Sequence, residues 1–456
     1  MDEFRIVDEN ARVIFEGRRR VRTSTDRETS RRGKSFSGIW HRLKRNPLVR
    51  IGPGLITGVA DDDPSGIATY SQAGAQFGLD MLWTMPLAYP LMAAVQSMCA
   101  EIGRVTGKGL AANIKAKFPP VVLKSVVLLL LVANTLNVAA DVAAMGEVAE
   151  LVSGLDRHLM TAFFVVFSLL LQIFVPYHRY VFFLRWLTLS LLAYAAVLFT
   201  VHVPWVEAAR KSVWPSLTLN FSTASMVVAI FGTTISPYLF FWQASEEVED
   251  LHARHGAALL TNPAAAPAEL RRIRWDTWIG MFYSNLTAYF IILATAVTLH
   301  VSGVRDIQTA AQAAGALRPL AGDFAFLLFA TGIIGVGLIG VPVLAGSAAY
   351  ALAEAMSWRS GLERKPQDAR GFYSVIAISV LAGLVIQYSP ISPMKALFWS
   401  AVINGIVAVP VMVVIILIAS STSVMGRFKS RRAIVVLGWI ATAIMGLAAA
   451  MMFIPS

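Results

Sequence analysis

Two long apolar segments of this chain are each interrupted in the middle by a polar stretch that contains proline. The first segment covers residues 47–78 and is interrupted by DDDPSG at residues 61–66. The second covers residues 224–242 and is interrupted by GTTISPY at residues 232–238. Carboxylates are costly in hydrocarbon, and non-helical backbone at membrane depth is tolerated only where protein buries it or it lines a watery cavity. Paired interruptions of this kind predict the binding site of a membrane transporter.

The composition excludes an ordinary soluble domain. Of the 456 residues, 56% are hydrophobic and 15% are charged, and the mean hydropathy is +0.62. Apolar runs repeatedly reach the length that is needed to cross roughly 30 Å of hydrocarbon. We therefore expect an all-α membrane protein with eleven spanning segments, at residues 47–78, 82–105, 121–151, 160–175, 180–202, 224–242, 277–301, 324–356, 373–388, 396–420 and 433–454. The interrupted segments are the first and the sixth, so they occupy equivalent places in two successive five-helix halves.

The net charge of +11 is distributed in a way that argues for membrane orientation rather than nucleic-acid binding. Most basic residues lie in the first 46 residues and in alternate loops, which is typical of cytoplasmic segments. We predict a cytoplasmic N-terminus, an external C-terminus and a location in the inner (plasma) membrane. Residues 1–46 are expected to form a disordered basic tail that touches lipid, and residues 47–456 the transmembrane domain. Within that domain, residues 252–274 are expected to form a flexible cytoplasmic linker, and residues 302–323 have room for a short external helix.

The chemistry of the two interruptions favours a hard cation. Pro64 and Pro237 lack a backbone N–H group and disfavour helix at the preceding residue. Gly66 and Gly232 permit a departure from helical geometry, so that unpaired carbonyls, hydroxyls and carboxylates are expected to gather around a cavity. Ligation by oxygen alone suits Mg²⁺, Ca²⁺ or Mn²⁺. The alternative is that the prolines only kink two packing helices, but a kink does not require three aspartates.

The stretch GPGLITGVADDDPSGIATYSQAGAQFG, residues 52–78, resembles the first helix of the natural resistance-associated macrophage protein (NRAMP) family of metal transporters. That family carries Asp-Pro-Gly-Asn at the break, followed by Ala-Thr and Gln-Ala-Gly. Its sixth helix carries Met-Pro-His where this chain has Ser236-Pro237-Tyr238. The resemblance extends from Asn46 onward. It implies a LeuT-like fold, in which two inverted five-helix repeats are followed by an eleventh helix.

The departures from the family pattern change the expected cargo. By the resemblance, Asp63 keeps the metal-binding aspartate, whereas the family's asparagine ligand becomes Gly66 and its methionine ligand becomes Ser236. Thr233 replaces an alanine whose carbonyl binds metal. Loss of a thioether removes a preference for softer metals, and smaller side chains are expected to widen the cavity. The pattern is similar to the NRAMP-related magnesium transporters, which implies partly hydrated Mg²⁺ as the cargo and Mn²⁺ as a second one.

The other two aspartates are harder to assign. Three consecutive residues point in different directions, so at most two of them can share a cavity. We include Asp62 in the candidate metal site with Asp63. For Asp61 and Asp62, both a charge near the site and pairing with a neighbouring helix remain open.

Proton coupling is expected to be weak or absent. Proton-coupled family members use the histidine that follows the sixth-helix proline, and this residue is Tyr238 here. Asp141 matches a family carboxylate on the third helix, but the acidic position one turn later is Ala144. Among other polar residues, Asn404 is a pathway candidate. Asn134 and Asn137 fit either the pathway or ordinary interhelical hydrogen bonds, of which the second is favoured.

These patterns predict a divalent-cation carrier that works by alternating access as a monomer in the lipid bilayer, with the metal as cargo and without a cofactor. The main alternative is a proton-coupled Mn²⁺/Fe²⁺ symporter. An enzyme is not expected, because no pairing of a nucleophile with a base occurs at membrane depth.

Overall fold

Helices make up the regular structure of the part of the chain that the computed structural model describes, and no strand occurs in that part. The described residues are 53–175, 189–216, 220–362, 364–386, 388 and 391–453. The predicted basic tail, residues 1–46, lies outside them. The α-helices are α2 (Pro53–Asp61), α3 (Pro64–Phe77), α4 (Thr84–Thr106), α5 (Leu110–Lys117), α6 (Pro120–Ser153), α7 (Arg157–Phe174), α9 (Leu192–Val197), α10 (Trp205–Val213), α11 (Phe221–Thr234), α12 (Pro237–Ala253), α13 (Ala266–Thr295), α14 (Ala310–Ala314), α15 (Arg318–Ala321), α16 (Ala325–Met356), α17 (Arg370–Ile386), α18 (Pro393–Ala419), α19 (Thr422–Met425) and α20 (Arg432–Met451).

Seven helical stretches within the described residues are long and apolar enough to cross a membrane. They contain α6, α7, α11 with α12, α13, α16, α18 and α20, which correspond to seven of the predicted segments. The first predicted segment is divided into the shorter helices α2 and α3, while α4 and α17 correspond to the second and ninth. The fifth predicted segment, residues 180–202, lies partly outside the described residues and contains α9.

The helix boundaries follow local chemistry. Helix α6 begins with Pro120 in its first turn and ends at Gly154, which has a φ of 72° that a glycine adopts at little cost. Helix α7 follows at once because the Asp156 side chain accepts hydrogen bonds from the backbone of His158 and Leu159.

One expected loop was partly wrong. We read residues 252–274 as a flexible linker, but α13 already begins at Ala266. Hydropathy hides this first part of the helix because it is rich in charged residues. Arg272 and Glu269 in it form ion pairs instead of exposing a disordered chain to water.

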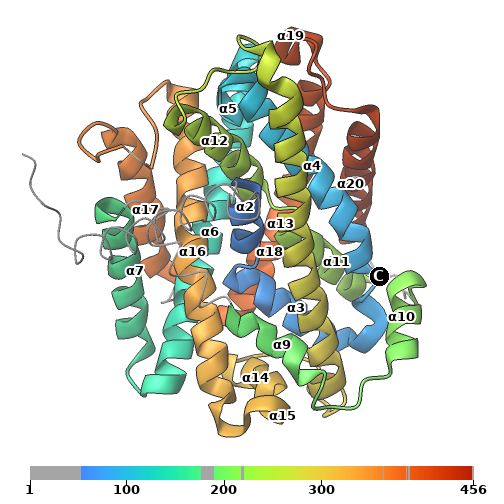
Figure 1. The fold of residues 1–456 in the computed structure, drawn as a ribbon. Coiled ribbons are helices and arrows are strands. Elements are labelled where there is room, and N and C mark those ends of the chain that lie inside the picture. Colours follow the sequence, from blue (N-terminus) through green and yellow to red (C-terminus); the bar gives the residue numbers. More distant parts are fainter. Residues whose placement is uncertain are drawn as a thin grey trace, which may run out of the picture. The chain divides into compact units, whose positions relative to one another are not determined.

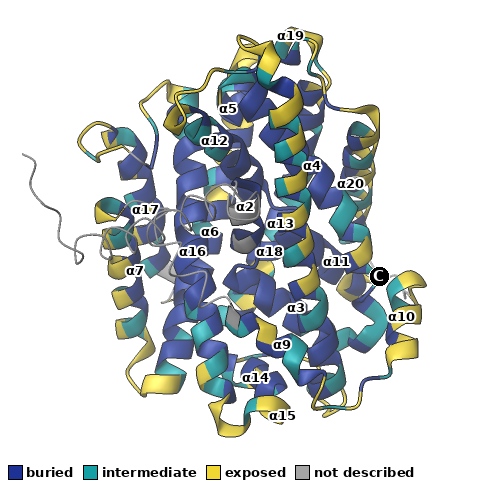
Figure 2. Ribbon diagram, viewed as in Figure 1, coloured by how far each residue is buried: buried dark blue, intermediate teal, exposed yellow. Residues whose placement is uncertain are grey.

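Helices α2 and α3 lie at the centre of the bundle, with α7 and α17 on one flank and α20 on another (Figure 1). Figure 2 shows the burial of much of α3, while the outer helices carry most of the exposed surface. Helix α2 packs so closely on α13 that a Cβ atom at Gly58 would lie 2.3 Å from the carbonyl oxygen of Gly280. Helix α16 packs along α6, and α18 packs against α11. Both interrupted segments are therefore enclosed by other helices, as non-helical backbone at membrane depth requires.

Candidate functional site

The first interruption lies between α2 and α3, where three aspartates are buried. Asp61, Asp62 and Asp63 are 0%, 2% and 1% exposed. Asp63 has an extended backbone and precedes Pro64, and its side chain caps α3. The Oδ1 atom of Asp63 accepts hydrogen bonds from the Gly66 N–H group at 2.8 Å and the Ser65 hydroxyl at 2.7 Å. The break is thus a helix start that fixes one oxygen of Asp63.

The other oxygen of Asp63 connects the break to two further helices. Its Oδ2 atom accepts hydrogen bonds from the Asn137 side-chain amide of α6 at 2.9 Å and from the Tyr238 hydroxyl of α12 at 3.3 Å. The Ser400 hydroxyl of α18 donates a hydrogen bond to the side-chain oxygen of Asn137, Oδ1, at 2.6 Å, and this bond orients the Asn137 amide group. Four donors therefore surround this carboxyl group and offset part of the cost of its burial.

Asp61 and Asp62 face a different helix. The Ser284 hydroxyl of α13 lies against both carboxyl groups, in a short contact with Oδ2 of Asp61 and at 3.1 Å from Oδ1 of Asp62. Of the two interpretations that the sequence left open, the contacts match pairing with a neighbouring helix. The structure thus groups Asp62 with Asp61 and Ser284, while Asp63 shares its hydrogen bonds with Asn137 and Tyr238.

The second interruption lies between α11 and α12 and has a different hydrogen-bond pattern. The Ser236 hydroxyl lies 2.5 Å from the carbonyl oxygen of Gly232 and 2.8 Å from that of Thr233. Thr234 donates to the carbonyl oxygen of Ile230 at 3.0 Å. The sequence led us to expect unpaired carbonyls here. Instead, these carbonyls accept hydrogen bonds because the hydroxyls turn back onto α11.

The two interruptions meet at Gly66. A Cβ atom at Gly66 would lie 3.1 Å from the Thr233 hydroxyl oxygen and 3.2 Å from the ring of Tyr70. Tyr70 is fully buried on α3. The expected widening of the site at Gly66 is therefore not seen in this conformation, because Tyr70 and Thr233 fill the space. Tyr70 was not among the predicted site residues, although it lies four residues after Gly66 and hence on the same helix face.

Asp141 lies in the same neighbourhood as Asp63. Both pack against Gly340 of α16, where a Cβ atom would lie 3.2 Å from Cβ of Asp63 and 3.8 Å from Oδ2 of Asp141. Asn404 is buried on α18, and neither polar atom of its side chain has a hydrogen-bond partner among the described residues. Gly232 packs against the α18 backbone at Ala401 and Gly405, which puts Asn404 on the turn beside the second interruption.

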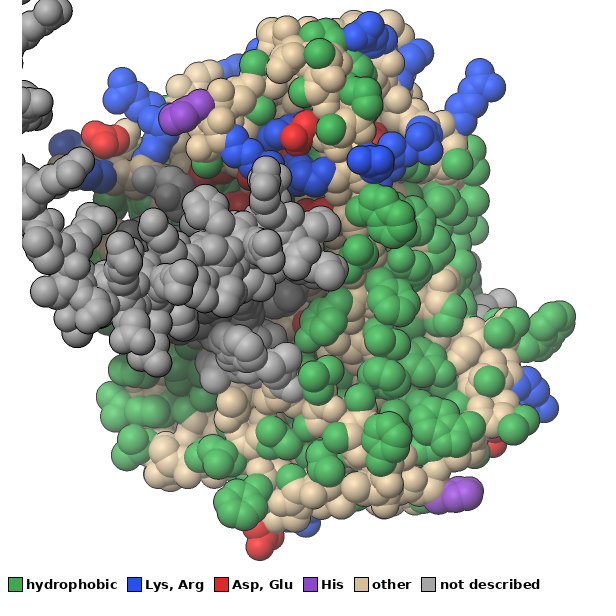
Figure 3. Space-filling model, in the orientation of Figure 1, with side chains coloured by type: hydrophobic (Ala, Val, Ile, Leu, Met, Phe, Trp, Pro, Cys, Tyr) green, Lys and Arg blue, Asp and Glu red, His purple; other side chains and the backbone are tan. Residues whose placement is uncertain are grey.

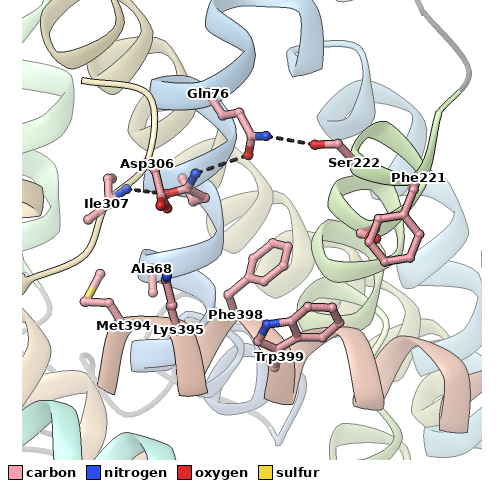
Figure 4. A pocket seen from close by; sticks show the side chains of 12 residues that line it. Ala68, Gln76, Phe221, Ser222, Asp306, Ile307, Met394, Lys395, Phe398 and Trp399 are labelled. Atoms are coloured by element: carbon pink, nitrogen blue, oxygen red, sulfur yellow. Dashed lines mark hydrogen bonds between the residues drawn. The ribbon is translucent and has the colours of Figure 1, made fainter. Parts of the chain in front are cut away.

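A cavity of about 280 Å³ lies between α3, α11 and α18 (Figure 4). On α3 its wall runs from Ala68, two residues beyond Gly66, to Gln76. Gln76 donates to Ser222 at 2.8 Å, and Gln72 accepts from the Ile307 N–H group at 2.8 Å. The lining residues are Ala68, Gln72, Gln76, Phe221, Ser222, Ser225, Asp306, Ile307, Met394, Lys395, Phe398 and Trp399. The cavity thus extends along α3 from the neighbourhood of the first interruption.

Ion pairs join the helices at the opposite end of α2. Arg104 of α4 pairs with Asp250 of α12 at 3.2 Å and with Glu269 of α13 at 2.6 Å. Arg272 of α13 pairs with the buried Glu247 of α12 at 2.6 Å. The Asp276 carboxylate accepts a hydrogen bond from the Gly54 N–H group at 2.8 Å, which attaches the start of α2 to α13. The cavity therefore lies along α3, whereas the opposite end, at the start of α2, is closed by ion pairs.

Comparison with known proteins identifies relatives over most of the chain. Residues 54–455 match the family model described as natural resistance-associated macrophage protein-like. A protein of Acidiphilium cryptum named divalent metal cation transporter MntH is 27% identical over 411 residues, which cover 85% of this chain and 86% of the relative. A protein of Klebsiella pneumoniae with the same name is 24% identical over 410 residues, covering 87% and 92%.

Two solved structures share the fold. The manganese transporter of Eremococcus coleocola, in complex with an aromatic bis-isothiourea substituted compound, aligns with a TM-score of 0.70 at 18% identity. The alignment covers 90% of this chain and 86% of that protein. Mhp1, a nucleobase-cation-symport-1 family transporter, aligns with a TM-score of 0.51 at 13% identity over 88% and 92% of the two chains. These likenesses confirm the predicted all-α, LeuT-like fold with its two broken helices.

Proposed function

Because the chain belongs to the natural resistance-associated macrophage protein family, whose members are transporters rather than enzymes, we propose that it carries divalent metal cations across a membrane. We propose partly hydrated Mg²⁺ as the preferred cargo and Mn²⁺ as a second one. In this family the metal is a transported substrate and not a cofactor. The observation that carries the proposal is the set of groups around Asp63, which consists of hydroxyl, amide and backbone groups without a thioether or imidazole among its described partners.

The proposed site has one charged ligand and several neutral neighbours. Asp63 supplies the anionic oxygen, and the hydroxyls or carbonyls of Thr233 and Ser236 border the cation from the second interruption. Gly66 adds no side chain of its own between the two, and the Tyr70 ring and the Thr233 hydroxyl, which lie there in this conformation, would move aside for the cation. Asp62, held on Ser284, contributes negative charge from the side of α13. Water molecules complete the coordination, since Mg²⁺ gives up water reluctantly and commonly keeps several waters in proteins.

Hydrogen bonds in the site suggest how the cation would be accepted. The Tyr238 contact with Asp63 is the longest of the four, at 3.3 Å. A cation that approaches Asp63 would displace this hydroxyl most easily, whereas Asn137 and the Gly66 N–H group keep the carboxylate oriented. Tyr238 would then line the pathway. This arrangement suits alternating access, in which one set of oxygens faces each side in turn.

We propose weak or absent proton coupling. The histidines among the described residues are His158, His202, His252, His255 and His300, and each lies in a loop or in the first or last turns of a helix. No imidazole is therefore placed beside Asp63 within the described part of the chain. The proximity of Asp141 to Asp63 favours the second candidate, a proton-coupled Mn²⁺/Fe²⁺ symporter, because a second buried carboxyl group provides a place for a proton. Asn404 remains a pathway candidate in either case.

We further propose that the protein acts as a monomer in the inner (plasma) membrane, with its N-terminus in the cytoplasm and its C-terminus outside. Lys and Arg side chains gather toward one end of the face that Figure 3 shows, and hydrophobic side chains cover the band below it. A basic end of this kind is typical of the cytoplasmic side. The ion pairs of Arg104 and Arg272 would then close the inner side in this conformation.

Uptake into liposomes tests the proposal. The full chain is reconstituted with an Mg²⁺-sensitive dye inside, and internal pH is followed in parallel samples. We expect saturable Mg²⁺ uptake that Mn²⁺ inhibits, without internal acidification, and none with Asp63→Ala. Uptake of Mn²⁺ alone with acidification would favour the symporter instead.

A further inference from the structure

A groove of about 570 Å³ lies on the outer face of α13 beside α4, away from the candidate site. It is lined by Tyr89, Arg271, Arg274, Trp275, Trp278, Ile279 and Phe282. The Tyr89 ring of α4 makes edge-on contacts with the rings of Trp278 and Phe282, with both pairs of centroids 5.6 Å apart. The Tyr89 hydroxyl also donates to the Trp278 carbonyl oxygen at 3.3 Å. The aromatic wall is thus ordered, and it is open on its outer side, where Trp275 is 67% exposed.

Two arginines stand at one end of this wall. Three arginines lie near the start of α13, and only Arg272 takes part in the ion pairs with α12. Neither Arg271 nor Arg274 forms an ion pair with a described residue. Arg271 is exposed, and the Arg274 Nε–H group donates to the Leu270 carbonyl oxygen at 3.0 Å. Arg274 also interacts electrostatically with the buried Glu101 carboxyl group of α4. The groove therefore has two guanidinium groups at one end and an apolar, aromatic surface along the rest.

We propose that this groove binds an anionic glycerophospholipid, with its phosphate on Arg271 and Arg274 and an acyl chain along Tyr89, Trp278 and Phe282. Basic pockets between membrane helices bind anionic headgroups, and guanidinium groups pair well with phosphate. A free anion would use only the two arginines, and a zwitterionic lipid would add no net negative charge beside the exposed Arg271. The combination of both surfaces fits a lipid that is anionic and has acyl chains.

The lipid would stabilise the helix against which the site is built. The side of α13 that faces the protein interior holds α2 through the Asp276–Gly54 hydrogen bond and the close contact of Gly280 with Gly58. Two turns further along, Ser284 contacts Asp61 and Asp62. A lipid that joins α4 to α13 would therefore make unfolding of this part of the bundle less favourable, since a ligand that binds only the folded state stabilises it.

Thermal unfolding of the purified full chain in neutral detergent tests the proposal. Phosphatidylglycerol, phosphatidylcholine and inorganic phosphate are titrated separately. We expect phosphatidylglycerol to raise the Tm of the wild-type chain in a saturable manner, and the other two to leave it unchanged. In R271Q/R274Q the apparent affinity for phosphatidylglycerol should fall by about thirty-fold. Each arginine near an anionic headgroup contributes about five-fold to the affinity, and the two contributions multiply.

Two variants serve as controls. R359Q/R370Q removes the same charge from two exposed arginines, one in the loop after α16 and one at the start of α17, and should bind phosphatidylglycerol like the wild type. R271K/R274K retains the charge and should recover part of the affinity. An equal response to phosphatidylcholine would overturn the proposal, as would a shift that inorganic phosphate alone reproduces or wild-type binding by R271Q/R274Q.

Discussion

The two interruptions of the central helices look alike in sequence and differ in chemistry. In both, an extended residue precedes a proline that begins the next helix: Asp63 before Pro64 in α3, and Ser236 before Pro237 in α12. The Asp63 side chain points forward and caps α3, while the Ser236 side chain turns back to carbonyls of α11. The same local backbone thus presents a charge in one case and a neutral, internally bonded hydroxyl in the other.

Because of this difference, we expect the two interruptions to have separate roles in binding the cation. Of the two interruptions, the first carries the charge, from three carboxylates whose partners lie on α3, α6, α12 and α13. The second provides neutral oxygens and shape. Substitutions in the first should therefore affect whether a cation is bound, and substitutions in the second should affect which cation is preferred.

The largest effect is expected for Asp63→Ala. Removal of the carboxylate that accepts hydrogen bonds from both Asn137 of α6 and Tyr238 of α12 should reduce metal uptake to the level of protein-free liposomes. Asp62 is held on Ser284 of α13 and is not expected to replace the anionic oxygen that contacts the cation. Uptake is measured with the dye assay at matched amounts of reconstituted protein. Near-normal transport by this variant would mean that Asp61 or Asp62 holds the cargo.

A smaller loss is expected for Asn137→Ala, which removes the amide that orients Asp63. Loss of such an outer partner commonly weakens metal binding by about ten-fold or more. The concentration of Mg²⁺ at half-maximal uptake should rise accordingly. Asn134→Ala is the matched control, because Asn134 lies one turn earlier on α6 and bonds to Leu344 and Ser347 instead. Equal effects of the two variants would point to loss of packing in α6.

Ser236→Met should change the preference more than the rate. A thioether beside the site favours softer metals, so uptake of Mn²⁺ should gain several-fold relative to Mg²⁺. Competition between the two ions in the same liposomes measures the ratio. Ser236→Leu controls for size, since it adds a similar volume without sulfur. If Leu and Met shift the ratio equally, steric change and not ligand chemistry is responsible.

The smallest effect is expected for Ser236→Ala. Its hydroxyl is hydrogen-bonded to α11, so the variant should lose about 1 kcal/mol of stability and little of its uptake rate. Thermal unfolding and uptake are measured on the same preparation. A loss of uptake as large as that of Asp63→Ala would show that both interruptions bind the cation directly and with equal weight.

Much of this site could be predicted from residue types and spacing. Proline, glycine and aspartate in an apolar run indicate both a helix break and its function, and the structure has breaks at both predicted places. The short helices α14 and α15 lie where an external helix was expected, in residues 302–323. Helix α13 was predicted too short, because its first turns pair charged residues with other helices.

The direction of each side chain could not be predicted. Asp62 could face either Asn137 and Tyr238 or helix α13. The choice depends on how α2 is rotated in the packed bundle, and the sequence of α2 alone does not specify that rotation. Asn137 and Asn134 are likewise equivalent in sequence, yet one contacts Asp63 and the other contacts α16. The filling of space at Gly66 by Tyr70 depends on contacts between α3 and α11 in the same way.

Calorimetric titration of Mg²⁺ into the purified full chain, compared with Asp63→Asn, tests whether Asp63 is the charged ligand of the cation. Asparagine keeps the size of the side chain and removes its charge. We expect saturable binding of one Mg²⁺ by the wild type and no measurable binding by Asp63→Asn over the same concentrations. Wild-type affinity in Asp63→Asn would contradict the assignment of Asp63 as the charged ligand.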